Sequence, residues 1–175
     1  RIYALVTTYA PLTVWLYRGG FCRFSSARYS NNAADLENVF MHLTNVAIQK
    51  KSADYSKDEH GGKWDLRQLK LYLMSRYGVV MVDRLFNEIQ MIVLRSLLAV
   101  QQVMIQDKHC FELYGYDVLI DDELKPWLIE VNASPSLTAD TPQDYELKFG
   151  LLDDTYSVAF DDGDYDDNVI EKYSV

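Results

Sequence analysis

Residues 111–137 read FELYGYDVLIDDELKPWLIEVNASPSL, and this stretch decides the fold of the chain. Two short runs within it, 114–121 and 127–132, alternate apolar and polar residues with the period of two that is typical of β-strands. The polar residues 122–125 separate the runs, and Pro126 suits the first position of a strand. The stretch therefore predicts an antiparallel hairpin in which each strand has one apolar face.

The register of this hairpin follows from the position of its turn. With the turn centred in the middle of 122–125, Leu119 lies opposite Leu128, and Asp117 lies opposite Glu130. Residues that face each other in this way have their side chains on the same side of the sheet. The hairpin therefore brings two carboxylates together.

Two carboxylates that face each other across a strand pair repel, so a packed sheet should avoid them. A hard divalent cation such as Mg²⁺ would turn the repulsion into binding, because it takes carboxylate, amide and phosphate oxygens. Asn132 lies one step along on the face of Glu130, so we predict that Asp117, Glu130 and Asn132 hold magnesium. The alternative is a solvated sheet face that carries acids. The apolar residues 127–128 and the turn at 133–136 favour a covered site instead.

The same stretch resembles the carboxyl-terminal part of the ATP-grasp domain of the tubulin-tyrosine-ligase-like enzymes. The resemblance continues upstream through Arg1-Ile-Tyr, LYRGGFCRFS at 16–25 and MHLTNVAIQK at 41–50. The words HLTN, YGYD and KPWLIEVNASPSL are most similar to the glutamylase branch, especially to the small members thought to work inside larger complexes. The resemblance implies an enzyme that uses ATP to add glutamate to glutamate side chains of tubulin tails.

The resemblance also implies a nucleotide site and its catalytic residues. Arg1, Thr44 and Asn45 would contact ATP, and the three residues of the predicted magnesium site would hold two Mg²⁺ ions that bridge its phosphates. Arg23 and Glu130 would be the catalytic residues. Arg1 would end a Lys-x-Asp-x-Arg word, so the first half of the nucleotide site, with its adenine-binding hinge, is expected upstream. We therefore expect the 175-residue chain to be inactive when it is isolated.

Four positions would contact the incoming amino acid. Taken alone, Arg23 is a solvated cation on an edge strand, but the resemblance implies that it faces the γ-phosphate and the amino acid. Lys63 and Lys148 are ordinary surface lysines when taken alone, and the resemblance implies that both lie near the amino acid. Where the family often offers a hydroxyl, this chain has Ala47. Three cations are more than glycine or tyrosine would need, so glutamate is the favoured substrate.

The rest of the chain predicts the fold class α+β. Residues 2–9, 12–17 and the run that follows a turn at Gly19-Gly20 predict three short antiparallel strands. Apolar residues recur at helical spacing in 64–77 and 80–106, which predicts two amphipathic helices packed against the apolar face of the hairpin. Together with the resemblance, this predicts the C-terminal portion of an ATP-grasp domain, an antiparallel sheet with packed amphipathic helices.

Polar segments set the predicted domain bounds. Residues 49–63 lack periodicity and predict an exposed, mobile loop, whereas 138–156 predict a helix that folds back over the site. With 175 residues and 49% hydrophobic content, the chain can form one core. Beyond residue 153 it turns acidic, as in FDDGDYDDN, which indicates a flexible tail. We therefore predict a partial ATP-grasp catalytic domain over 1–153 and an acidic tail over 154–175.

Composition excludes several classes of function. No apolar run reaches the 18 or more residues that a membrane span requires, and the net charge of −9 argues against nucleic-acid binding. Cys22 and Cys110 lack metal-ligand spacing and predict free thiols in the cytosol. The expected partners are free L-glutamate, tubulin or microtubules with acidic tails, and helper subunits. The expected location is the cytoskeleton, at an axoneme of a cilium or flagellum or at a basal body.

Three alternatives remain from the sequence. The chain could be a catalytically silent scaffold of microtubules or axonemes, but a silent protein should lose its unpaired acids first. It could ligate glycine or tyrosine, because every amino acid presents the same α-carboxylate. A magnesium-dependent phosphoesterase would use the carboxylates but would not need Lys63 and Lys148.

Overall fold

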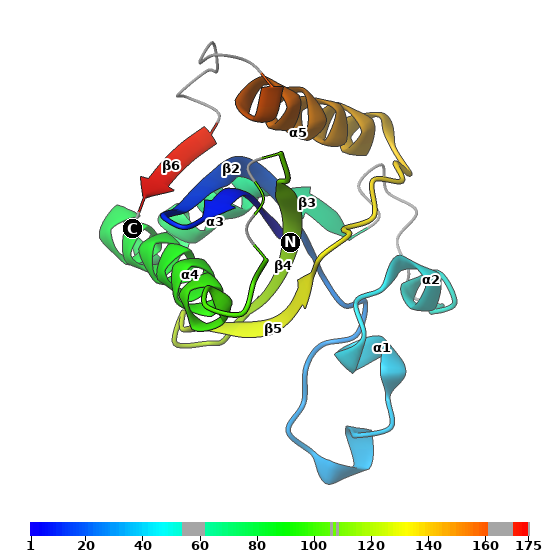
Figure 1. Cartoon of the computed structure of the whole chain (residues 1–175). Helices are drawn as coiled ribbons and strands as arrows, with labels where there is room; N and C mark the ends of the chain where they lie inside the picture. The colour runs from blue at the N-terminus through cyan, green and yellow to red at the C-terminus, as the bar shows by residue number, and fades with distance from the viewer. Residues whose placement is uncertain (54–61, 106, 108, 161–169, 175) are drawn as a thin grey trace. The chain divides into compact units, whose positions relative to one another are not determined.

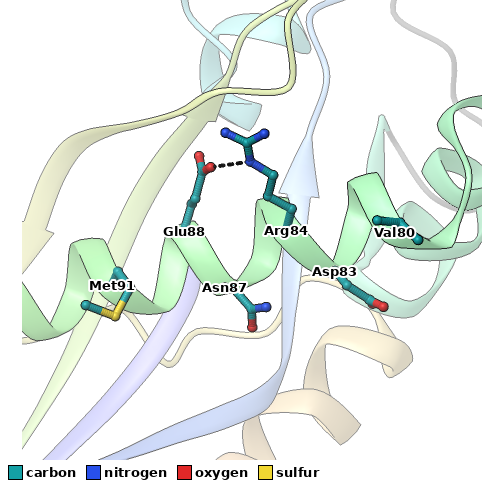
Figure 2. Close-up of a pocket in the computed structure, with 6 residues that line it drawn as sticks. All are labelled: Val80, Asp83, Arg84, Asn87, Glu88 and Met91. Carbon is teal, nitrogen blue, oxygen red and sulfur yellow. Dashed lines mark hydrogen bonds and ion pairs between the residues drawn. The ribbon is translucent and has the colours of Figure 1, made fainter.

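The computed structural model in Figure 1 describes residues 1–53, 62–105, 107, 109–160 and 170–174. The chain divides into two compact units. The first unit comprises residues 1–20 and 70–175 and contains the predicted hairpin. The second unit comprises residues 21–69.

The first unit is built on an antiparallel sheet. Its strands are β1 (Ile2–Tyr9), the first part of β2 (Leu12–Arg23), β4 (Glu112–Ile120), β5 (Pro126–Asn132) and β6 (Ile170–Ser174). β1 pairs with β2 and β4, β4 pairs with β5, and β6 pairs with β2. β1 is therefore flanked on both sides, and Tyr3 and Ala4 are fully buried in it.

Two helices cover opposite faces of this sheet, as Figure 1 shows for α4 (Val79–Val100) and α5 (Pro142–Phe160). The hydroxyl groups of Ser96 on α4 and Tyr116 on β4 lie 2.8 Å apart. Leu113 of β4 packs in a cluster with Val158 of α5. Leu113 and Tyr116 are three residues apart in one strand, so their side chains lie on opposite faces. The sheet is thus the middle layer between the two helices.

The predicted apolar stripe of α4 is confirmed, and it forms the core on one face of the sheet. The stripe residues that are buried recur at intervals of three or four: Val82, Leu85, Ile89, Val93 and Leu97. The predicted end at residue 106 was too late, because α4 ends at Val100. Val103 and Ile105, which lie just beyond the helix, are 79% and 93% exposed and bury little surface that would hold a longer helix.

The predicted turn at Gly19-Gly20 is wrong, because β2 runs without a break from Leu12 to Arg23. The two glycines allow a register shift in the strand, since Ile2 pairs with Gly20 whereas Ala4 pairs with Leu16. A Cβ atom at Gly19 would clash with the ring of Tyr17 and lie 3.0 Å from Leu147 Cδ1. The two glycines therefore permit an irregularity within one strand, and they do not form a turn that reverses the chain.

The acidic end of the chain is more structured than the predicted tail. α5 continues through residues 154–160, because Thr155 is buried and Val158 packs against the sheet. Residues 170–174 form β6. Residues 161–169 lie outside the described part of the chain, so the expectation of a flexible segment there stays a prediction.

The second unit consists of short elements. They are the C-terminal end of β2, η1 (Ala33–Asp35), α1 (Val39–His42), α2 (Val46–Gln49), β3 (Lys63–Asp65) and the first residues of α3 (Leu66–Tyr77). The exposed loop predicted for 49–63 is wrong at both ends, because Gln49 is buried in α2 and Lys63 begins β3. Residues 54–61 lie outside the described part of the chain.

The predicted free thiols are confirmed, since Cys22 and Cys110 form no disulfide. Burial raises the pKa of the Cys22 thiol. The helices in the described part of the chain are too short or too polar to cross a membrane.

Candidate functional site at the end of the hairpin

The predicted hairpin is present, and its acidic pair lies as expected. Asp117 of β4 is the register partner of Glu130 of β5, and Gly115 is the partner of Asn132. Asp117 lies two residues after Gly115 on the same side of the strand. Two neighbouring strands therefore bring two carboxylates and one amide together on one face of the hairpin.

The other half of the predicted register is wrong. Leu128 pairs with Val118, and Leu119 pairs with Trp127, because the register shifts between Asp117 and Val118. β5 contains one extra residue at Ile129, which is the pattern of a β-bulge. Sequence periodicity gave no sign of the bulge, since Ile129 fits the alternation of the strand.

Arg1 forms an ion pair with Asp117 at this site. Arg1 Nε donates to Asp117 Oδ1 at 2.6 Å, and Arg1 Nη2 donates to Asp117 Oδ2 at 2.9 Å. This bidentate geometry is the strong form of an arginine–carboxylate bond. The hydrogen bond raises the pKa of Arg1, although burial opposes it, and the charges of Asp117 and Glu130 add to the rise. Arg1 thus offsets the repulsion between the two acids.

Glu130 and Asn132 leave oxygen atoms open at the same site. Glu130 is exposed. Asn132 Nδ2 donates to Gly115 O at 3.2 Å and lies 3.5 Å from Asp117 Oδ2, so the amide oxygen of Asn132 is turned away from these acceptors. Carboxylate and amide oxygens are hard donors that suit Mg²⁺. The residues present therefore fit the predicted metal by the chemistry of their donor atoms.

Two carboxylates and an amide do not make a complete metal cage. In the part of the chain that the structure describes, no cluster of three or more His, Cys, Asp or Glu side chains could hold a metal ion. Mg²⁺ usually binds through one or two carboxylates together with substrate phosphates and waters. The two carboxylates and the amide at the hairpin match this arrangement, in which phosphates and waters supply the other ligands.

The predicted cover over the site is absent among the described residues. Trp127 and Leu128 are 47% and 40% exposed, and Ala133 and Ser136 are also exposed. Residues 127–131 of β5 are in fact all exposed. The apolar faces that alternation predicts on β5 are therefore open, whereas Tyr116 on β4 is buried against α4.

Asp121 is an acid that organises the turn and does not join the site. Its Oδ1 accepts from the backbone N–H groups of Glu123 and Lys125 at 3.0 and 2.9 Å, and its Oδ2 accepts from Trp127 Nε1 at 2.8 Å. The bond from Trp127 contributes most to lowering the pKa of Asp121. This role is typical of Asp at the start of a tight turn.

The loop 133–141, which follows Asn132, passes close to Arg1. A Cβ atom at Gly115 would lie 2.8 Å from Pro135 Cβ and 3.1 Å from Arg1 Nη1. Only glycine allows this close approach of a side chain and a loop to the strand. The glycine of the YGYD word therefore lets Pro135 and Arg1 pack directly against β4.

Lys148, predicted to contact the amino acid, is buried on α5. Its Nζ donates to Asp144 Oδ2 at 2.9 Å and to the carbonyl oxygen of Thr138. The side chains of Lys148 and Asp144 are 9% and 2% exposed. Asp144 is a residue that sequence reasoning missed, since Asp and Lys four apart on a helix usually form an exposed pair.

The second unit brings Arg23 and Lys63 together. They are register partners of β2 and β3, and both lie over the ring of Phe21, with Arg23 Cζ at 5.1 Å and Lys63 Nζ at 3.9 Å from its centroid. Two cations directly opposite each other destabilise a sheet unless an anion compensates them. The fold therefore places two cationic side chains side by side on neighbouring strands.

The HLTN word lies in a segment held by a buried glutamine. Gln49 Nε2 donates to the carbonyl oxygen of Leu43 at 2.5 Å, and Gln49 Oε1 accepts from Ser26 Oγ at 2.6 Å. Thr44 is half-buried, and Asn45 precedes α2 without using its side chain as a cap. The side chain of Asn45 is therefore not consumed by the helix. Sequence reasoning missed Gln49 because it lies in a polar run.

Ala47 is exposed on α2 and has no polar side-chain atom to offer. The predicted site residues therefore fall into two groups. Arg1, Asp117, Glu130, Asn132 and Lys148 belong to the first unit, and Arg23, Thr44, Asn45, Ala47 and Lys63 belong to the second.

Comparisons with known proteins agree with the resemblance. The model of the tubulin-tyrosine ligase family matches residues 1–166. The chain is 52% identical over 168 residues to the probable alpha-tubulin polyglutamylase Ttll1 of Tetrahymena thermophila, which covers 96% of this chain and 40% of that protein. It is 55% identical over 158 residues to the probable tubulin polyglutamylase TTLL9 of Bos taurus, which covers 90% of this chain and 34% of that protein.

A more distant relative is the human tubulin polyglutamylase TTLL5, to which the chain is 37% identical over 172 residues. The match covers 90% of this chain and 13% of that protein. The chain thus spans well under half the length of these relatives.

An antiparallel sheet between helices, with two facing carboxylates on its hairpin and an arginine bound to one of them, defines an α+β domain. The chain belongs to the tubulin-tyrosine ligase family. The predicted fold class, an ATP-grasp-like α+β domain with packed amphipathic helices, is therefore confirmed.

Proposed function

We propose that this protein is an ATP- and Mg²⁺-dependent ligase that adds glutamate to glutamate side chains in the C-terminal tails of tubulin. The observation that carries the proposal is the register pair of Asp117 and Glu130, with Asn132 beside it and Arg1 bound to Asp117. Relatives that share 37% to 55% identity with the chain are named tubulin polyglutamylases, which supports both the substrate and the amino acid.

The proposed reaction has two steps. A carboxylate oxygen of the substrate side chain attacks the γ-phosphorus of ATP, forming an acylphosphate and releasing ADP. The amino group of free glutamate then attacks the acyl carbon, forms the amide bond and expels inorganic phosphate, with loss of a proton from nitrogen. No side-chain nucleophile is required, so catalysis rests on positioning and electrostatic stabilisation.

The hairpin end would hold the nucleotide's metal ions. Glu130 and Asn132 offer open oxygens, and Asp117 would share its carboxylate between the metal and Arg1. Bound Mg²⁺ would neutralise charge on the phosphate oxygens. Arg1 would keep Asp117 oriented and add positive charge beside the phosphates. Glu130 is thus the residue whose carboxylate is most directly available.

The second unit would supply the remaining contacts to the ligands. Thr44 and Asn45 would bind the nucleotide through side chains that α2 does not use. Arg23 and Lys63 would bind carboxylates or phosphate, because guanidinium and ammonium groups donate hydrogen bonds to these anions. Ala47 cannot donate a hydrogen bond, so the amino acid would be held by these cations and by Lys148.

The substrate assignment is tested by which amino acid is incorporated. In the full-length protein, with any subunits that it requires, we expect labelled glutamate to enter tubulin tails and glycine to enter far less. Lys63→Ala combined with Lys148→Ala should suppress glutamate incorporation. A control substitution at the exposed Lys50 should leave incorporation unchanged. Equal or better incorporation of glycine would overturn the assignment.

The partners of the protein follow from its charge. The net charge of −9 repels acidic tubulin tails over about 8 Å at physiological ionic strength. We therefore propose that helper subunits, or basic regions outside this chain, provide lattice recognition, and that the protein acts at the cytoskeleton, in an axoneme or a basal body. The 175-residue chain should stay in the supernatant when microtubules are sedimented. Salt-sensitive pelleting of this chain alone would refute the need for a helper.

A further inference from the structure

The strongest unassigned feature of the molecule is a charged cluster at the start of α5. Asp144 Oδ2 accepts hydrogen bonds from Lys148 Nζ at 2.9 Å and from the backbone N–H of Asp140 at 3.2 Å. The backbone N–H of Asp144 donates to Thr141 Oγ1 at 3.2 Å. One buried carboxylate thus joins the helix, the lysine and the end of the loop 133–141.

The cluster has an energetic cost, because charged groups lose their hydration when they are buried. The side chain of Asp144 is 2% exposed, and that of Lys148 is 9% exposed. A buried pair of this kind is weak evidence for added stability, since the loss of hydration offsets the attraction between its charges. Its presence therefore calls for a role beyond holding the fold together.

The loop that the cluster holds begins at the candidate metal site. Asn132 ends β5, and Pro135 packs against Gly115 beside Arg1. At the other end, the carbonyl oxygen of Thr138 accepts from Lys148, and Asp140 donates to Asp144. The loop is therefore held at one end by the approach of Pro135 to Gly115 and at the other end by Asp144 and Lys148.

The ammonium group of Lys148 has one donor left for a ligand. Lysine carries three N–H donors, and two of those of Lys148 are taken by Asp144 and Thr138. Among the described residues, no further acceptor of Lys148 is found. Because its two bonds restrict the rotation of the ammonium group, Asp144 and the carbonyl oxygen of Thr138 together set the direction of the third N–H.

We propose that Asp144 is a positioning residue for the incoming amino acid: its buried carboxylate orients Lys148, so that the third N–H of Lys148 meets a carboxylate of glutamate, and it fixes the loop beside Asn132. This inference rests on the proposed function. Asp144 itself touches no substrate, and it acts through Lys148 and through the backbone of Asp140.

The test compares Asp144→Asn with Glu146→Gln in the full-length protein. Both substitutions remove one negative charge from α5, but Glu146 is exposed, so it serves as the matched control. We expect Asp144→Asn to raise the KM for glutamate about tenfold, the effect of losing one hydrogen bond to a charged group. The KM for ATP should stay within a factor of about two, and Asp144→Glu should restore part of the glutamate affinity.

A readout that is independent of catalysis accompanies the kinetics. Hydrogen exchange of the backbone amides at 138–141 should be faster in Asp144→Asn than in the wild type and unchanged in Glu146→Gln. If Asp144→Asn folds poorly, the double variant Asp144→Leu with Lys148→Met replaces it, because replacing both charges leaves none unpaired. That variant should fold, and its KM for glutamate should match that of Lys148→Met alone, because Asp144 acts on glutamate through Lys148. A KM well above that of Lys148→Met would contradict the inference.

The outcomes separate this inference from the proposed function. A wild-type protein that incorporates no glutamate would overturn both. A wild-type protein that incorporates glutamate while Asp144→Asn keeps the wild-type KM would overturn the inference alone. Equal losses for ATP and glutamate, together with a lower melting temperature, would mark Asp144 as purely structural and would also overturn it.

Discussion

Two ion pairs lie at the two ends of the loop 133–141, and they differ in how much water reaches them. The side chains of Arg1 and Asp117 are 15% and 33% exposed, and this pair adjoins the open oxygens of Glu130. The side chains of Lys148 and Asp144 are only 9% and 2% exposed. Water reaches the first pair, whereas the second pair is almost fully buried.

The difference shows how similar bonds can serve distinct purposes. A half-exposed carboxylate can share its charge between an arginine and an arriving cation, because water compensates for the rearrangement. A buried carboxylate cannot change partners without a large desolvation cost, so it is suited to fix geometry. On this account Asp117 takes part in ligand binding, and Asp144 sets the position of its neighbours.

The largest expected effect is the loss of ligation in Glu130→Gln. The substitution removes a negative charge that would bind the metal ion. It should not disturb the packing of the fold, since the side chain of Glu130 is exposed. Ligation by the full-length protein should fall at least about 100-fold, within the range known for removed transition-state electrostatics. The melting temperature should not change. Glu123→Gln in the exposed turn of the same hairpin is the control, and wild-type turnover by Glu130→Gln would contradict the metal assignment.

The next effect distinguishes the two ion pairs by stability. Asp144→Ala leaves the buried ammonium of Lys148 without its carboxylate, which should lower the free energy of unfolding by about 3 kcal/mol. Chemical denaturation of the full-length protein measures the change. A decrease in the free energy of unfolding smaller than about 1 kcal/mol would show that water reaches Asp144 and Lys148. The two ion pairs would then not differ in burial as this account requires.

Asp117→Ala should destabilise the protein less, by about 1 kcal/mol, because Arg1 can regain solvent on loss of its partner. Its effect on ligation should nevertheless exceed that of Asp144→Ala. Parallel measurements of unfolding and of glutamate incorporation for the two variants check this reversal of order. If the same variant showed the larger loss in both stability and ligation, the assignment of Asp117 to ligand binding and of Asp144 to positioning would be contradicted.

These features differ in how far the sequence predicts them. The predicted pair of Asp117 and Glu130 is present, but the turn alone does not produce it. The pairs nearest the turn are displaced by one residue from the predicted register, and the extra residue in β5 brings Glu130 back opposite Asp117. Periodicity could not reveal the bulge at Ile129, since an extra residue leaves the composition of a strand unchanged. The continuous β2 was missed for a related reason, because Gly19 and Gly20 signal both turns and irregular strands.

The residues that hold the site in place were the hardest to predict. Asp144 and Gln49 lie in polar runs, where the usual environment is solvent, and only the fold shows that both are buried. The resemblance identified Arg1, Arg23, Lys63 and Lys148, but it gave no indication of what orients them. Tertiary packing decides the partners of such side chains, and a single sequence records it only indirectly.

The smallest expected effect concerns stability at alkaline pH. Burial raises the pKa of the phenols of Tyr17 and Tyr116 above the ordinary value of 10.0. The unfolded chain therefore ionises first, so stability is fully present below pH 10 and is lost as the pH rises through the folded-state pKa values. The melting temperature should fall as the pH rises above about 10, and less steeply in Tyr116→Phe. A flat profile in this range would contradict the burial of these hydroxyl groups.

The central claim, that the end of the hairpin binds Mg²⁺ with ATP, is tested most directly by calorimetry. ATP is titrated into the full-length protein with and without Mg²⁺, and the same titrations are made with Glu130→Gln. We predict that Mg²⁺ tightens ATP binding to the wild type at least about tenfold, and that this gain is lost in Glu130→Gln. An equal gain from Mg²⁺ in both proteins would contradict the claim.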